Sequence, residues 1–255
     1  MHIAFSRTDH RPWPLPQGHW TWRQSWQDLL FAHWRVPAAV IRPIVPKSLT
    51  VQEFDGTSWV GLVPFRMAGV MRRPLPDLAG LSTFPELNLR VYVVRDGKPG
   101  VWFLSLDAAN RVAVWAARRF FHLPYFLADI QFARQADDFC FSSRRVGKEH
   151  VPSFSARYRP SSAVFEAQAG SLESFLAERY CLYAQSPSGS LYRADVHHVP
   201  WPLQKASGDV EATELVTPHG ITLVGKPVLH FSRGVDVVIW PMVRFAEQSD
   251  AADSR

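Results

Sequence analysis

Phe84-Pro85-Glu86-Leu87-Asn88-Leu89-Arg90-Val91-Tyr92-Val93-Val94 alternates polar and apolar side chains along its length. Because successive side chains of a strand point to opposite sides, this alternation predicts a β-strand. One predicted face carries four chemically distinct polar residues: Glu86, Asn88, Arg90 and Tyr92. The opposite face carries Leu87, Leu89, Val91 and Val93. The polar face is either the wall of an internal pocket or the solvent-exposed face of an antiparallel sheet.

Short strands bounded by turn residues dominate the rest of the sequence. A turn at 96–100 leads into a predicted strand at 100–107, and further strands are predicted at 31–35, 57–67, 128–134, 138–146, 153–159, 162–168, 180–185, 190–197, 210–216, 228–232 and 235–242. Helices are predicted at 37–42, 108–121 and 171–179, the last two with Asp107 or Asn110 and with Ser171 as N-caps. This pattern favours a mainly β (α+β) antiparallel barrel or sandwich with two or three peripheral helices.

A single domain over residues 21–245 is the simplest organisation, because the sequence shows no linker, repeat or low-complexity tract. Residues 1–20 are rich in Pro, His and Arg and are expected to form an N-terminal extension that packs on this domain. Residues 246–255 are small and polar, which predicts a disordered tail.

The composition argues against a disordered chain, a nucleic-acid-binding protein and a membrane protein. Apolar residues make up 47% of the 255 residues, enough for a substantial core. The net charge of +5 comes mostly from scattered arginines without a continuous basic run, so nucleic-acid binding is not expected. Two cysteines without metal-binding spacing, no signal peptide and no membrane span predict a soluble cytoplasmic protein without a membrane partner.

Glu86 and Arg90 are the candidate functional charges of the 84–94 strand. Four residues of strand separate them by roughly 13 Å, so they cannot pair with each other. A buried carboxylate without a partner has a raised pKa and can act as a general acid or base. Arg35, at the end of the first strand, could face an anionic ligand or pair with Glu86, and the alternative is a structural ion pair in the barrel. No metal site or cofactor-binding motif is predicted.

Five segments resemble the DUF2071 (YqjF-like) family of bacterial proteins over about residues 20–243. They are 31–37, 41–49, 84–90, 98–108 and 230–232. This family is related to acetoacetate decarboxylase, so the resemblance implies an antiparallel β-barrel or cone that encloses a ligand pocket. It also implies that Arg35 and Glu86 occupy positions that face the pocket in the related enzyme.

The decarboxylase differs from this sequence at its nucleophilic lysine, which lies in a Tyr-Pro-Lys-Lys-like turn. The corresponding turn here is 122–126, and it places Tyr125 and Phe126 where lysines would stand. Decarboxylation through an imine needs an amine nucleophile. Neither Lys98 nor Lys148 matches the motif, so this chemistry is not expected, although whether Lys148 reaches the pocket stays open.

The sequence therefore predicts a pocket that binds a small organic anion or carboxylate without a Schiff-base lysine. Bidentate donors and polar contacts are expected from Arg35, Asn88, Arg90 and Tyr125, with Trp34, Trp102 and Phe126 as aromatic walls. One alternative is a lysine-independent lyase, hydratase or isomerase that uses Glu86 as its catalytic acid/base. A second alternative is an interaction protein with a vestigial pocket. The identity of the ligand and homo-oligomerisation stay open.

Overall fold

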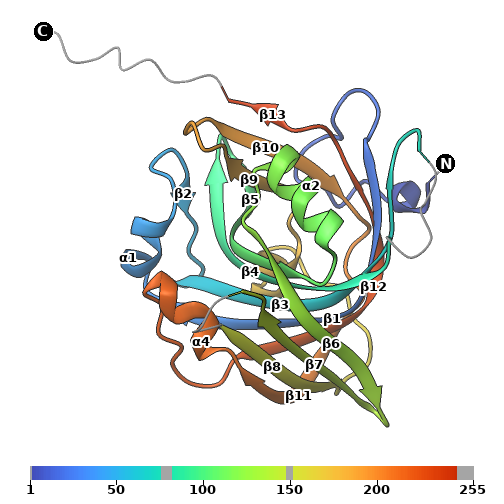
Figure 1. The fold of residues 1–255 in the computed structure, drawn as a ribbon. Coiled ribbons are helices and arrows are strands. Elements are labelled where there is room, and N and C mark those ends of the chain that lie inside the picture. The colour runs from blue at the N-terminus through green and yellow to red at the C-terminus, as the bar shows by residue number, and fades with distance from the viewer. Residues whose placement is uncertain (1, 76–81, 148–151, 246–255) are drawn as a thin grey trace, which may run out of the picture.

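The chain folds into a curled 13-stranded sheet, shown in Figure 1 as a computed structural model that describes residues 2–75, 82–147 and 152–245. The strands are β1 (Trp22–Val36), β2 (Thr50–Val51), β3 (Ser58–Arg72), β4 (Phe84–Arg95), β5 (Lys98–Ala108), β6 (Tyr125–Gln135), β7 (Asp138–Arg145), β8 (Ser153–Pro160), β9 (Cys181–Gln185), β10 (Leu191–His197), β11 (Leu203–Glu211), β12 (Val228–Ile239) and β13 (Val243–Arg244). The predicted mainly β architecture is confirmed.

Seven strands close on themselves through their hydrogen-bonded pairs. The order around this ring is β12–β1–β3–β4–β5–β9–β10, and β10 pairs back to β12. All of these pairs are antiparallel except β5–β9, and β5 also pairs in parallel with β6 outside the ring. The sheet is thus mixed rather than purely antiparallel, because the chain returns to both sides of β5 after helical crossovers.

A second layer of strands, β6–β7–β8–β11, packs on the outside of the ring. The main hydrophobic core lies between the two layers and takes Leu30, Ala32, Leu87 and Leu89 from the ring and Phe139, Phe141, Phe154 and Tyr158 from the second layer. A separate cluster that includes Leu29, Phe31, Val63 and Phe65 faces the inside of the ring. Side chains of β1 and β3 therefore alternate between two apolar environments.

Both faces of β4 are buried, which decides between the two interpretations of its polar face. Leu87, Leu89, Val91 and Val93 belong to the core between the layers. Glu86, Asn88 and Arg90 point into the ring and are 2%, 9% and 8% exposed. The solvent-exposed alternative is wrong, and the polar face is an internal wall.

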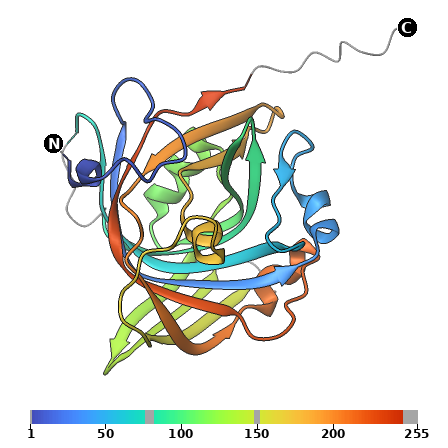
Figure 2. The ribbon, with the colours of Figure 1, turned by 180° about the vertical axis from the view of Figure 1, so that it is seen from behind.

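Two helices cover the ends of the ring. The helices of the described residues are α1 (Ala38–Ile41), α2 (Arg111–Phe121), α3 (Leu172–Ala177) and α4 (Thr213–Val216), with 3₁₀ turns η1 (Ile3–Ser6), η2 (Arg42–Ile44) and η3 (Thr217–His219). Figure 1 shows α2 across one opening, and the opposite view in Figure 2 shows α3 across the other. As predicted, Asn110 caps α2 and Ser171 caps α3. No helix among the described residues has the length and apolarity that a membrane crossing requires.

The segment before β1 lies against β10. Arg11 Nη1 donates to the carbonyl of Val196 at 2.6 Å, and Trp13 Nε1 donates to Asp195 Oδ1 at 2.9 Å. These contacts fix this segment over the ring wall. The tail predicted at 246–255 lies outside the described residues.

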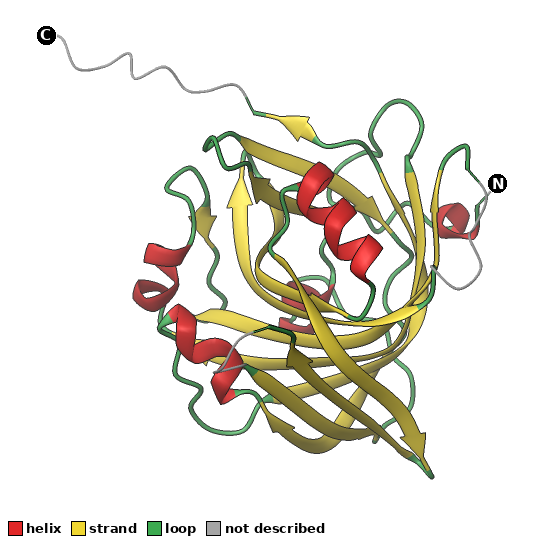
Figure 3. Cartoon of the chain, in the orientation of Figure 1, coloured by secondary structure: helices red, strands yellow, loops and turns green. Residues whose placement is uncertain are grey.

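Four predicted strands differ from the structure, whose secondary structure is coloured in Figure 3. Residues 162–168 form no strand and contribute only a bridge between Phe165 and Leu203. Residues 213–216 are helical, and β11 ends before them at Glu211. The two strands predicted at 228–242 are one strand, β12, which runs through Gly234. A Cβ at Gly234 would lie 2.2 Å from the carbonyl oxygen of Trp26, so this glycine permits the close approach of β1.

Candidate functional site

The ring encloses a cavity of about 170 Å³ between α2 and α3. Most of its wall is apolar and includes Trp22, Trp26, Phe31, Phe65, Met67, Phe84, Phe103, Phe121 and Trp201. Its polar lining is small: Gln24, Glu86, Asn88, Arg90, Tyr125, Arg179, Cys181 and His198. An apolar cavity with a few convergent polar groups is the usual form of a small-molecule site.

Glu86 and Tyr125 meet inside this cavity. The Tyr125 hydroxyl donates to Glu86 Oε2 at 3.0 Å. Burial raises the pKa of Glu86 to about 8, although the hydrogen bond from Tyr125 acts in the opposite direction. Burial likewise raises the pKa of Tyr125 well above its ordinary value. At neutral pH the pair therefore holds two protons that it can share with a ligand.

Asp107 lies behind the cavity wall and adds to the raised pKa of Glu86 through its negative charge. Its own carboxylate is bound by Arg145 Nε at 2.8 Å. Burial outweighs this ion pair and raises the pKa of Asp107 to about 6. Two acidic groups with raised pKa values thus come from neighbouring positions of the β4–β5 pair.

Arg90 is a buried cation without a carboxylate partner among the described residues. Its Nη2 donates to the Leu176 carbonyl at 3.0 Å, and its Nε has no hydrogen-bond partner. Its guanidinium carbon lies 5.6 Å from the ring centroid of Phe31 and equally far from that of Tyr92. Asn88 Oδ1, two residues away on the same face, is also buried without a partner. Native proteins seldom leave such groups unpaired, so Arg90 Nε is a donor and Asn88 Oδ1 an acceptor that water or a ligand could satisfy.

Arg179 brings a second buried guanidinium to the cavity. Its Nε donates to the Phe175 carbonyl at 2.7 Å and its Nη1 donates to Gln52 Oε1 at 2.6 Å. No carboxylate of the described residues pairs with it, and burial lowers its pKa to about 10. Arg90 contributes to this lowering, because two like charges near each other disfavour ionisation. An anion placed between them would stabilise both charges.

Tyr92 and His33 support Arg90 from the end of the cavity. The Tyr92 hydroxyl donates to the Leu176 carbonyl at 2.8 Å and lies 2.6 Å from His33 Nε2. Because Tyr92 has one hydroxyl hydrogen, His33 must donate from Nε2. Burial lowers the pKa of His33 well below its ordinary value, so the imidazole is neutral.

Comparison with known proteins identifies the family of this chain. The model of DUF2071, described as an uncharacterized conserved protein, matches residues 23–236. The uncharacterized protein YqjF of Bacillus subtilis (strain 168) is 42% identical over 233 residues, which is 91% of this chain and 96% of YqjF. The chain belongs to the DUF2071 family. The family resemblance expected from the sequence is confirmed.

Solved structures show that this DUF2071 protein has an acetoacetate decarboxylase-like fold. Acetoacetate decarboxylase from Legionella pneumophila superposes with a TM-score of 0.64 at 13% identity, covering 96% of each chain. The enduracididine biosynthesis enzyme MppR, complexed with a condensation product of pyruvate and imidazole 4-carboxaldehyde, gives 0.69 at 13% identity over 90% of each chain. At such identity the likeness establishes the fold alone.

The structure brings four of the eight predicted site residues of this DUF2071 protein together: Glu86, Asn88, Arg90 and Tyr125 line the cavity. Trp102 and Phe126 point away from the cavity. Each is next in sequence to a residue that lines the cavity, and successive side chains of a strand point to opposite sides. Trp102 precedes Phe103 and borders a separate surface hollow. Phe126 follows Tyr125, and its ring centroid lies 3.9 Å from the guanidinium carbon of Arg145.

The two predicted site residues on β1 also lie outside the cavity. Trp34 belongs to the core between the layers, as do Leu30 and Ala32, which point to the same side of β1. Arg35 is exposed, and its guanidinium carbon lies 5.1 Å from the ring centroid of Trp59. Arg35 points to the same side of β1 as Phe31. It lies four residues further along the strand, beyond the end of the cavity. Arg35 therefore does not pair with Glu86.

Arg179 and His198 were missed from the sequence. Arg179 stands at the end of the predicted 171–179 helix, but nothing local indicates that this helix ends at the ring interior. No lysine is among the described residues that line the cavity. Lys98 Nζ lies 5.6 Å from the ring centroid of Trp13, and Lys148 lies outside the described residues. Within the described part of the chain, no three potential ligands cluster as a metal site.

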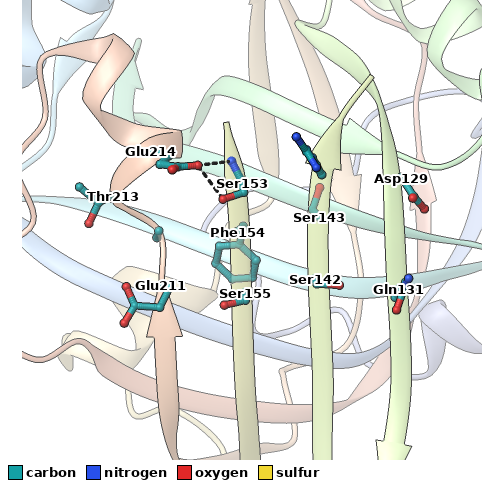
Figure 4. A pocket seen from close by; sticks show the side chains of 12 residues that line it. Asp129, Gln131, Ser142, Ser143, Ser153, Phe154, Ser155, Glu211, Thr213 and Glu214 are labelled. Carbon is teal, nitrogen blue, oxygen red and sulfur yellow. Dashed lines mark hydrogen bonds between the residues drawn. The ribbon is translucent and has the colours of Figure 1, made fainter. Parts of the chain in front are cut away.

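A larger hollow of about 590 Å³ lies on the outer layer of this DUF2071 protein, over β6, β7 and β8 (Figure 4). Most of its lining is exposed, including Asp129, Gln131, Ser142, Ser155 and Glu211. Its drawn hydrogen bonds run from Ser153 N and Oγ to Glu214 Oε2, at 3.1 and 2.6 Å. Such groups are satisfied by water and by one another, so the enclosed cavity is the stronger candidate site.

Proposed function

We propose that the ring cavity binds a small organic anion through Arg90 and Arg179. The observation that carries this proposal is the buried guanidinium of Arg90, which lines the cavity with an unpaired Nε and without a carboxylate among the described residues. A buried charge is costly unless it is paired. A carboxylate ligand would supply the missing charge and acceptors, and the amide N–H of Asn88 and the hydroxyl of Tyr125 would be further donors to it.

Two observations support this function over a vestigial pocket. A vestigial pocket would be filled and its charges paired internally, whereas this cavity remains and Arg90 Nε has no partner. In addition, one structural neighbour, MppR, has been solved in complex with pyruvate, an organic anion, at a TM-score of 0.65. The same fold thus accommodates a carboxylate in another protein.

Acid/base catalysis by Glu86 is a second candidate function, favoured by the Glu86–Tyr125 hydrogen bond. A carboxyl group whose pKa is about 8 can donate a proton at neutral pH and take it back afterwards. Proton transfer of this kind suits a lyase, hydratase or isomerase that needs no lysine. We do not propose an imine route, because no described cavity-lining residue is a lysine.

We also propose a cytoplasmic location. Cys140 and Cys181 are both free, and burial raises the pKa of Cys181 to about 12. Free thiols are typical of proteins in reducing compartments.

The anion-binding function is tested with Arg90→Met, a substitution that keeps an unbranched apolar stem and removes the guanidinium. Thermal shifts are measured against a panel of carboxylates and keto acids for wild type, Arg90→Met and Arg35→Met, the last an exposed arginine outside the cavity. We expect shifts in wild type and Arg35→Met that disappear in Arg90→Met. Absence of any shift in wild type, or equal shifts in Arg90→Met, would contradict the proposal.

The catalytic candidate is tested separately with Glu86→Gln. If screening with bound carboxylates yields an activity, Glu86→Gln should lose it by about 10²-fold or more while still binding the ligand. Full activity in Glu86→Gln would exclude Glu86 as the acid/base.

A further inference from the structure

We infer that the ligand is an apolar monocarboxylate about the size of hexanoate or benzoate, with its carboxylate at Arg90 and its apolar body toward Phe84. This inference rests on the proposed anion-binding function and specifies the class of ligand. It is carried by the order of side chains along the cavity, by the cavity volume and by the position of Glu86.

The cavity has a charged end and an apolar end. Along the inner face of β4 the order is Phe84, Glu86, Asn88 and Arg90, and same-face neighbours on a strand are about 6.6 Å apart. Arg179 lies at the Arg90 end, since both guanidinium carbons are near the Tyr92 ring, at 4.8 and 5.6 Å from its centroid. Met67 pairs with Phe84 at the other end. A bound carboxylate would therefore lie at one end of the ligand only.

The Phe84 end is lined mainly by apolar side chains, with Gln24, whose Oε1 accepts from Trp26 Nε1, as its polar exception. Met67, Val70, Phe84, Ala117 and Phe121 line it from β3, β4 and α2. A hydroxyl or second charge placed there would lose its water without gaining a partner, which is costly. Hydrocarbon is the chemistry that this wall accepts.

The volume limits the size of the hydrocarbon body. An apolar protein cavity of about 150 Å³ binds benzene, so the 170 Å³ cavity accommodates a phenyl ring or a chain of about five to seven carbons with its carboxylate. Acetate would leave most of the apolar wall empty. A chain of ten carbons exceeds the volume of the cavity.

Glu86 adds discrimination against dicarboxylates. It lies between the two ends, 2% exposed, with Oε2 already occupied by the Tyr125 hydroxyl. A second ligand carboxylate directed away from Arg90 would approach this acidic group and the apolar wall beyond it. Neither offers a positive charge to the second carboxylate, and burying an unpaired charge is costly. The site should thus select one carboxylate per ligand.

The inference is tested by calorimetric titration of the full chain with straight-chain carboxylates from acetate to decanoate, together with benzoate, adipate and 1-hexanol. Burial of each CH₂ should tighten binding about fourfold up to roughly hexanoate, after which affinity should fall. Adipate and 1-hexanol should bind at least about tenfold more weakly than hexanoate. Ala117→Leu, which reduces the volume of the apolar end, should weaken hexanoate by more than fivefold and weaken acetate much less. Val112→Leu, at an exposed position of the same helix, is the matched control.

The outcomes separate this inference from the proposed function. If acetate, pyruvate or adipate binds more tightly than hexanoate, and Arg90→Met abolishes that binding, the anion site stands and the inferred ligand class is wrong. If 1-hexanol equals hexanoate, or if Arg90→Met binds hexanoate as wild type does, the anion site itself is wrong. A rising affinity through decanoate would overturn the size limit.

Discussion

The Tyr125 hydroxyl donates to Glu86 Oε2 at 3.0 Å across an intervening strand. Glu86 on β4 stands opposite Ala108 of β5, and Tyr125 on β6 stands opposite Leu106 of β5. The small side chain of Ala108 leaves room for the two polar groups to meet above β5. The parallel β5–β6 pair therefore has a chemical consequence, because it brings residues 39 positions apart into one buried hydrogen bond.

Tyr125→Phe should raise the pKa of Glu86 above 8. The tyrosine hydroxyl stabilises the charged carboxylate, so its removal favours the protonated form. The pKa is measured by ¹³C NMR of glutamate-labelled protein. Tyr158→Phe is the control, since it also loses a buried hydroxyl bond, to the Asp28 carbonyl at 2.9 Å, in a different part of the molecule. A lowered or unchanged Glu86 pKa in Tyr125→Phe would mean that the hydrogen bond does not favour the anion.

Glu86→Gln should stabilise the protein increasingly as pH rises from about 4.5 to 8. The folded-state pKa of Glu86 lies above its ordinary value, so the fold favours the protonated form, and this contribution is complete at low pH and lost as pH passes through 8. Because a tenfold change in the protonation equilibrium is worth about 1.4 kcal/mol, the difference in unfolding free energy should reach several kcal/mol at pH 8.

Urea unfolding of wild type and Glu86→Gln at several pH values measures this difference. The exposed Glu53→Gln substitution is the control, with no comparable trend expected. A constant difference between wild type and Glu86→Gln across the range would contradict a buried, protonated Glu86.

The strand that carries Glu86 could be predicted from sequence because its two faces differ chemically. Leu87, Leu89 and Val91 face a wholly apolar core, so the period of two is visible in the residue types themselves. Which side of β4 faces a cavity is a property of the closed ring. That closure depends on pairing between residues such as Val196 and Ile239, which no local pattern indicates.

Arg35 and Arg179 show why only half of the predicted site residues line the cavity. Arg35 lies on the side of β1 that faces the cavity, but the cavity ends before it, at His33 and Tyr92. Arg179 enters the cavity because α3 crosses one end of the ring, as Figure 2 shows. Depth along a strand and the position of a crossing helix are set by tertiary packing, so neither arginine could be placed from its neighbours in sequence.

Arg90→Met should keep the stability of the ligand-free protein within about 1 kcal/mol of wild type. The substitution loses a hydrogen bond to the Leu176 carbonyl, but it also removes a buried charge that lacks a carboxylate partner among the described residues. Tyr92 still donates to the same carbonyl. Chemical denaturation without added carboxylate measures the change.

A loss above about 3 kcal/mol in Arg90→Met would indicate that Arg90 has a structural role instead. Arg145→Met provides the contrast. It removes the partner of buried Asp107, so it should raise the pKa of Asp107 further and cost more stability near neutral pH than Arg90→Met does.

Gly61→Ala should destabilise the wall behind Arg90 by about 1–3 kcal/mol, because overpacking forces neighbours to move. A Cβ at Gly61 would lie 2.8 Å from His33 Nε2 and 3.2 Å from the Tyr92 hydroxyl, the two groups that hold the end of the cavity. Chemical denaturation of Gly61→Ala, His33→Ala and the double variant measures the coupling. We expect the added methyl to cost much less once the imidazole is gone. Additive losses would show that the methyl is accommodated elsewhere, and that the contact between Gly61 and His33 does not set the geometry of this end of the site.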